Sequence, residues 1–151
     1  MNSKSLLSPE ASIRRDKILL VAGRTFLSCR VFEDALLFLL ASVEEHENPS
    51  EGEAFARAWD FHSSKTTGQV AGSLRKLVDL PANFEQLVAE GIQARNKFIH
   101  GFLRDIVWEV LSEDGSDAML AQLRDIHTTV QSRMRAVLGV GHAVMVAQRG
   151  I

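Results

Sequence analysis

Residues 24–47 read RTFLSCRVFEDALLFLLASVEEHE, and this stretch decides the fold. Its apolar residues recur at three- and four-residue steps, as they do on the buried face of a helix. They also fall on more than one side of that helix, because Phe26, Leu27 and Val31 add to the run from Leu36 to Leu40. A helix that is apolar on several sides is typical of the middle of a helical bundle. The stretch therefore predicts an all-α fold with this helix at its centre.

The residues that flank this stretch predict where its helix ends. Asn48-Pro49-Ser50 stops it, since the residue before a proline disfavours the helical conformation. Upstream, Ser8-Pro9-Glu10 has the order of a helix start, with a capping serine, a proline in the first turn and an acid beside the helix dipole. We expect a short helix from there to Ala22, a break at Gly23, and a flexible N-terminus over residues 1–8.

Four further segments complete the expected architecture. The apolar spacing predicts helices over residues 51–64, 69–78, 83–102 and 116–148. Asn83 is the expected cap of the third of these, with Gln86 in the capping-box position. Residues 105–111 are expected to be a turn or a helix extension, and residues 112–116 an acidic loop. The prediction is a single domain over residues 1–151, an up-and-down bundle of four to five helices.

Composition excludes several classes of protein. Apolar residues make up 46% and charged residues 24% of the 151 positions, as in folded globular chains. The net charge of −2 is not that of a strongly basic nucleic-acid-binding domain, so any RNA contact must come from a local patch. The single cysteine, Cys29, cannot form an internal disulfide and fits a reducing, cytoplasmic location. No signal peptide and no membrane-length apolar run is apparent, and Glu44 to Glu47 are interpreted as a solvated helix end rather than a metal cluster.

The candidate functional residues lie late in the helix predicted over residues 83–102. Its apolar stripe is interrupted at Arg95-Asn96-Lys97-Phe98-Ile99-His100, where Arg95 occupies a position that the pattern reserves for an apolar side chain. A guanidinium is always charged and is costly to bury unpaired. Arg95 therefore needs an acidic partner, for which Glu33, Asp34 or a second chain are the candidates. Local conflicts of this kind are typical of functional sites.

Helical geometry places these polar residues relative to one another. At about 100° per residue, Asn96 and His100 share one face, whereas Arg95 and His100 lie about 140° apart. A bend near Gly101, or a second copy of the helix facing the first, would let Arg95 and His100 reach one target. Taken singly, each residue also has a structural interpretation. A histidine near a helix end is favoured by the dipole, and an arginine on an apolar stripe can extend past it to water.

The string Ala94-Arg95-Asn96-Lys97-Phe98-Ile99-His100-Gly101-Phe102 resembles the motif of the HEPN superfamily (higher eukaryotes and prokaryotes nucleotide-binding domains). That motif is an arginine, usually followed by a polar residue such as asparagine, and then a histidine four to six residues beyond. The resemblance covers roughly residues 23–149 and includes the size and helical character of the domain. It implies a HEPN-like helical fold with the motif in its second half.

The resemblance also implies a function. Many HEPN proteins are metal-independent ribonucleases, often toxins of toxin–antitoxin or phage-defence systems, and they act as homodimers in which both copies line a shared cleft. Carried over, it makes Arg95 and His100 catalytic, with Asn96 assisting, and it implies RNA as substrate, no cofactor, and a cognate antitoxin protein as a partner. The alternative is a non-catalytic HEPN-like module that binds nucleotides or proteins, or a motif that only stabilises its own core.

Two further elements are candidates for substrate binding. Lys97 adds positive charge beside the motif, although it is equally expected to face solvent. Residues 65–69 include Lys65, Thr67 and Gln69 and resemble the threonine–glycine element that often precedes the motif helix in HEPN sequences. The order of residues there does not match a phosphate-binding P-loop, because the preceding glycine-rich run is missing.

Overall fold

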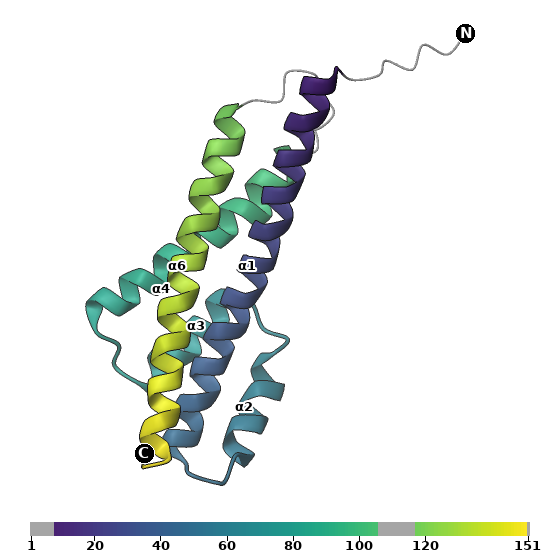
Figure 1. Ribbon diagram of the computed structural model, residues 1–151. Coiled ribbons are helices and arrows are strands. Elements are labelled where there is room, and N and C mark those ends of the chain that lie inside the picture. The colour runs from purple at the N-terminus through teal and green to yellow at the C-terminus, as the bar shows by residue number, and fades with distance from the viewer. Residues whose placement is uncertain (1–7, 106–116, 151) are drawn as a thin grey trace.

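The computed structural model describes residues 8–105 and 117–150, and these form an all-α structure without strands (Figure 1). The helices are α1 (Pro9–Glu47), α2 (Glu53–His62), α3 (Thr67–Leu77), α4 (Ala82–Asn96), the π-helix η1 (Lys97–Phe102) and α6 (Asp117–Gln148). The predicted all-α class is confirmed. The expectations for residues 1–7 and 106–116 lie outside the described residues, whereas Ser8 caps α1 by accepting a hydrogen bond from the Ala11 N–H.

The two long helices α1 and α6 run side by side in the same direction and pack over most of their length (Figure 1). The α6 stripe predicted from the sequence is buried against α1 at Leu123, Val130 and Val137. At one end of the pair, the Gln148 amide donates to the Ser42 carbonyl over 2.9 Å. The core of the described residues therefore lies along α1, as its leucine-rich sequence predicted, and α2 and α3 also pack on this helix.

The turn between α1 and α2 is held by one carboxylate. Glu45 accepts hydrogen bonds from the backbone N–H groups of Ser50, Gly52 and Phe55 and from the Ser50 hydroxyl, over 2.8 to 3.2 Å. Gly52, with φ of 98°, occupies the cap position of α2 and has no side chain to cap it. Glu45 therefore takes the capping role from the preceding helix. These bonds hold the pKa of Glu45 at about 2.

Helix α4 packs mainly on α6 and continues into η1, which contacts both long helices. Gly91 lets α4 lie close to α1 as well, because a Cβ at that position would lie 2.5 Å from Cζ of Phe32 in α1. The apolar stripe predicted for this segment is confirmed, with Val88, Phe98 and Phe102 buried. The segment is not one uniform α-helix, however, because its last six residues adopt the wider π-helical turn.

Three sequence expectations are wrong. Gly23 does not break the first helix, since α1 is continuous over 39 residues. Asn83 does not cap α4; Pro81 holds that position and Gln86 bonds Glu90 instead. The third concerns three apolar residues of α1, Phe26, Leu27 and Val31, which are exposed rather than covered by neighbouring helices. Within residues 8–105 and 117–150, no helix combines the length and apolarity needed to cross a membrane.

Candidate functional site

Arg95 and Glu33 form an ion pair between α4 and α1. The Arg95 Nε lies 2.6 Å from Oε1 of Glu33, and each side chain is 21% exposed. The sequence placed Arg95 on an apolar stripe and predicted an acidic partner for it, with Glu33 among the candidates, and the pair confirms this. A charge-assisted bond of this length fixes the position of the guanidinium.

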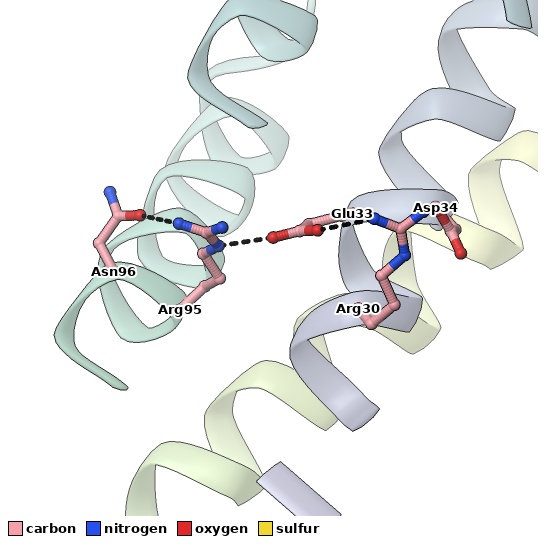
Figure 2. Close-up of polar contacts among 5 residues, drawn as sticks. All are labelled: Arg30, Glu33, Asp34, Arg95 and Asn96. Atoms are coloured by element: carbon pink, nitrogen blue, oxygen red, sulfur yellow. Dashed lines mark hydrogen bonds and ion pairs between the residues drawn. The ribbon is translucent and has the colours of Figure 1, made fainter. Parts of the chain in front are cut away.

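The pair belongs to a larger network on α1 (Figure 2). The second Glu33 oxygen lies 3.6 Å from Arg30 Nη1, and Arg30 Nη2 lies 3.3 Å from Asp34 Oδ1. Two arginines therefore alternate with two carboxylates, and the four formal charges cancel. Glu33 and Asp34, which lie three and four residues after Arg30, both form ion pairs with it. Because Glu33 is shared between two guanidinium groups, it is held in place from both sides.

Asn96 orients the other end of the Arg95 guanidinium. Its Oδ1 accepts a hydrogen bond from Arg95 Nη1 over 3.0 Å (Figure 2). With Nε bound to Glu33, Arg95 Nη2 makes no hydrogen bond to any residue that the structure describes. The guanidinium is thus fixed at two nitrogens and retains donor capacity at the third, which suits recognition of a phosphate or carboxylate.

The π-helical turn changes where His100 lies relative to Arg95. Leu103 N–H bonds to the Phe98 carbonyl, five residues earlier. A turn with this bonding advances the chain by roughly 80° per residue rather than 100°. Counting from Arg95, this brings His100 to about 80° away around the axis, compared with about 140° in a uniform α-helix. Sequence analysis expected a bend near Gly101, and the π-turn Lys97–Phe102 supplies the rotation instead.

His100 is exposed, and its side chain has no hydrogen bond or ion pair with the described residues. The imidazole is therefore accessible to a ligand on the outside of η1. Asn96, which the uniform helix placed on one face with His100, is also exposed but bonds Arg95. The structure thus joins Arg95 and Asn96 directly, and it shows no side-chain contact between His100 and either of them.

Lys97 lies on another side of the helix. It lines a groove of about 420 Å³ between α4 and α6, together with Gln93, Gln122, Asp125 and Arg133. Arg133 is anchored there by two bonds to Glu90 Oε2, at 3.0 and 2.5 Å. Arg95 instead faces α1. The motif is therefore divided between two sides of α4, and Lys97 is separated from the guanidinium that it was predicted to assist.

The residues from the 65–69 element have local roles in the structure. Lys65 places its Nζ 3.8 Å from the centre of the Phe61 ring. Gln69 and Thr66 form a reciprocal capping box at the start of α3, and Thr67 is buried. Within the described part of the chain, no hydrogen bond or ion pair connects Lys65, Thr67 or Gln69 with the Arg95 cluster. Their predicted role in substrate binding stays a prediction.

Cys29 lies in the core beside the Arg95–Glu33 pair. Burial raises its pKa to about 11, the positive charge of Arg95 partly offsets this rise, and the negative charge of Glu33 adds to it. The thiol is therefore protonated at neutral pH and is not an activated nucleophile. Cys29, 1% exposed, is a core residue.

Sequence reasoning missed one buried titratable residue, His62. It is 8% exposed at the end of α2, and its Nδ1 has no hydrogen-bond partner among the described residues. Burial lowers the pKa of His62, the charge of Lys65 lowers it further, and Glu44 opposes the change. The only sequence signal was its position at the end of a predicted helix, where a histidine is usually exposed. Among the residues described, no three His, Cys, Asp or Glu side chains are grouped to hold a metal ion.

No family model, functionally curated protein or solved structure matches the chain. The geometry of the cluster around Arg95 is therefore the basis for the functional proposal.

Proposed function

We propose that the chain is a metal-independent endoribonuclease of HEPN type, acting in the cytoplasm as a homodimer with Arg95 and His100 at a dimer cleft. We further propose that the protein is the toxin of a toxin–antitoxin or phage-defence system. The arrangement of its helical bundle is proposed to be HEPN-like. The observation that carries it is the π-helical turn, which rotates an exposed His100 toward the side of an anchored Arg95. Such turns are rare and often lie at functional sites.

The chemistry fits these residue types. In RNA the 2′-hydroxyl attacks the adjacent phosphorus, forming a 2′,3′-cyclic phosphate while the bond to the 5′-oxygen of the next nucleotide breaks. An imidazole can take the 2′-hydroxyl proton or protonate the leaving oxygen. The Nη2 of Arg95, which makes no hydrogen bond to the described residues, can donate to a phosphate oxygen and stabilise charge that grows on it. Asn96 supports the reaction by holding Nη1.

The test is RNA cleavage in EDTA by purified wild-type protein and by His100→Ala. The expected products carry a 2′,3′-cyclic phosphate or its hydrolysis product, and the variant should be slower by about 10²–10⁴-fold. Because His100 is exposed and unbonded, the variant should retain its melting temperature. Equal cleavage by both proteins would assign the activity to a contaminant. DNA should remain intact because it lacks the 2′-hydroxyl, and cleavage of DNA at a comparable rate would contradict the mechanism.

The second candidate is a non-catalytic HEPN-like module that binds a nucleotide or a protein. The Arg95–Glu33 pair favours it, since a guanidinium already neutralised by a carboxylate has less attraction left for phosphate. This candidate predicts no cleavage of RNA by the wild type, together with binding that Arg95→Ala weakens. Cleavage that depends on His100 excludes it.

A further inference from the structure

The first half of α1 exposes an apolar face. Eleven large apolar side chains of the described residues are exposed, and six of them lie on this helix: Ile13, Leu19, Leu20, Phe26, Leu27 and Val31. Each is between 43% and 63% exposed. Together they expose on the order of 500 Å², near the upper end of what monomeric proteins leave uncovered. A face of this size on a rigid helix is typical of an interaction surface.

Five of the six residues follow a coiled-coil spacing. Ile13, Leu20 and Leu27 are seven residues apart, as are Leu19 and Phe26. Seven residues make almost two helical turns, so each set forms a line along one side of the helix. The whole face, from Ile13 to Val31, rises over 18 residues, or about 27 Å. Gly23 lies between the two lines, and no other part of the described structure comes within 4 Å of the Cβ position there. The face is therefore open and has a shallow centre at which another helix can approach closely.

We infer that this face of α1 binds the same face of a second copy of the chain, with the two helices antiparallel and crossing near Gly23. The inference deepens the homodimer of the proposed function by naming its surface. A second copy is the occupant that the sequence of the face fits, because an antiparallel pairing about Gly23 is self-complementary. Residues whose numbers add to 46 then lie opposite each other.

Around Gly23 this register places apolar residues opposite apolar ones and an acid opposite a base, whereas Ile13 and Val31 at its ends lie opposite the charged Glu33 and Arg15 of the partner subunit. Leu19 meets Leu27 of the partner subunit, and Leu20 meets Phe26 of the partner subunit. Asp16, whose side chain is 69% exposed, meets Arg30 of the partner subunit, whose counterpart here is 63% exposed. A parallel pairing would instead place Asp16 against Asp16 and Arg30 against Arg30, which like-charge repulsion disfavours. The charges therefore select the antiparallel arrangement.

The register also determines where the candidate sites lie. Glu33 falls opposite the partner subunit's Ile13, so the two copies of Glu33 are separated by 20 helical residues, about 30 Å. Each Arg95 is bonded to its own Glu33. Two Arg95 side chains that far apart cannot contact one phosphate. The dimer then has two clefts, one toward each end of the α1 pair, and each uses Arg95 and His100 of one chain.

Sedimentation of two charge variants at tens of micromolar tests the surface. The wild type should have twice the mass of the chain, and Leu27→Glu should be a monomer of unchanged helicity. Phe61→Glu is the matched control, because Phe61 on α2 is 66% exposed and Leu27 is 63% exposed, and it should remain a dimer. A monomeric wild type, or a dimer that survives Leu27→Glu, would overturn the inference.

Disulfide cross-linking tests the register. Gly23→Cys should give a covalent dimer on mild oxidation, because the two introduced thiols meet at the crossing. Ile13→Cys should not, since an antiparallel pair separates its two copies by about 30 Å. Wild type serves as the background, because Cys29 is buried. Cross-linking of Ile13→Cys would indicate a parallel pair, and failure of Gly23→Cys in a dimeric protein would place the interface elsewhere. RNA cleavage is a separate readout. A dimer that does not cleave RNA would contradict the ribonuclease but not this surface, whereas cleavage by a monomer would contradict the homodimer and its surface but not the RNA chemistry.

Discussion

The Nε of Arg95 is bonded to Oε1 of Glu33 across 62 residues of sequence, over 2.6 Å. This contact joins the candidate site to the central helix of the fold. It gives Arg95 a structural role in addition to any chemical one, because a guanidinium and a carboxylate that are each only 21% exposed depend on each other. Variants of the two residues can separate these roles.

Removing either partner should lower stability. Arg95→Ala leaves Glu33 partly buried with only the more distant Arg30, so the free energy of unfolding should fall by up to about 3 kcal/mol. Lys97→Ala, next along the same helix but in the α4–α6 groove, should change it by less than about 0.5 kcal/mol. Urea denaturation followed by circular dichroism measures both. If the Arg95→Ala protein is as stable as the wild type, the pair contributes little and Arg95 is retained for function alone.

Mixing two inactive variants distinguishes one shared cleft from two separate clefts. Arg95→Ala and His100→Ala are each expected to lose RNA cleavage. With two clefts that each draw on one chain, the mixture should stay inactive even after subunits exchange. A cleft that combines Arg95 of one chain with His100 of the other would recover about a quarter of wild-type activity in an equal mixture. Co-purification through a tag on one variant shows that exchange has taken place.

The ionised Glu45 carboxylate should stabilise the protein, and its protonation at low pH should remove this stabilisation. Its pKa is about 2 in the folded chain against an ordinary value of 4.5. The unfolded chain therefore binds a proton first as pH falls, and the stabilisation, fully present above about pH 5, is lost progressively toward pH 2. Melting temperatures of wild type and Glu45→Gln should differ most at pH 6 and converge only near pH 2. Glu47→Gln, also at the end of α1, is the control, and a constant difference across this range would contradict the assignment.

His62 should destabilise the fold in mild acid. Burial lowers its pKa in the folded chain below the ordinary value of 6.5. Between pH 7 and 5 the unfolded chain therefore takes up a proton that the folded chain resists, and stability falls as pH falls. His62→Phe should remove this dependence, while His46→Gln on the exposed end of α1 should retain it. An NMR titration in which His62 protonates at its ordinary pKa would show that the prediction is wrong.

Gly91, the one glycine of α4, should not tolerate a larger residue. A methyl group there would meet Phe32 Cζ and Cε2 at 2.5 and 2.7 Å, so Gly91→Ala should cost about 1–3 kcal/mol. Gly139→Ala in α6 has open space and should stabilise by up to about 1 kcal/mol through helix propensity. Thermal unfolding of the two variants gives opposite shifts if this is right, and a neutral Gly91→Ala would mean that Phe32 rotates away at little cost.

Periodicity predicted the helices because the buried faces of α4 and α6 follow regular spacing. Glu33 and Asp34 were candidate partners of Arg95 because they interrupt the apolar run of the central helix. Periodicity failed where packing between distant segments decides. Gly23 costs α1 only about 1 kcal/mol relative to alanine, which the length and packing of that helix exceed. The π-turn at Lys97–Phe102, the capping of α2 by Glu45 and the burial of His62 leave no local signature. The exposure of Phe26 and Leu27 could not be predicted either. The spacing of apolar residues in the sequence is the same whether the face they form is covered by their own chain or by another chain.

The pairing of α1 with α6 sets the order in which the protein can be completed during synthesis. The Ser42 carbonyl can accept its hydrogen bond from the Gln148 amide only after 106 further residues have been synthesised. Until α6 leaves the ribosome, the apolar residues of α1 that pack on α6 have no cover, although α2 and α3 can already pack on other parts of α1. Nascent chains stalled before residue 117 should therefore be protease-sensitive, and the structure should form only when the last helix emerges.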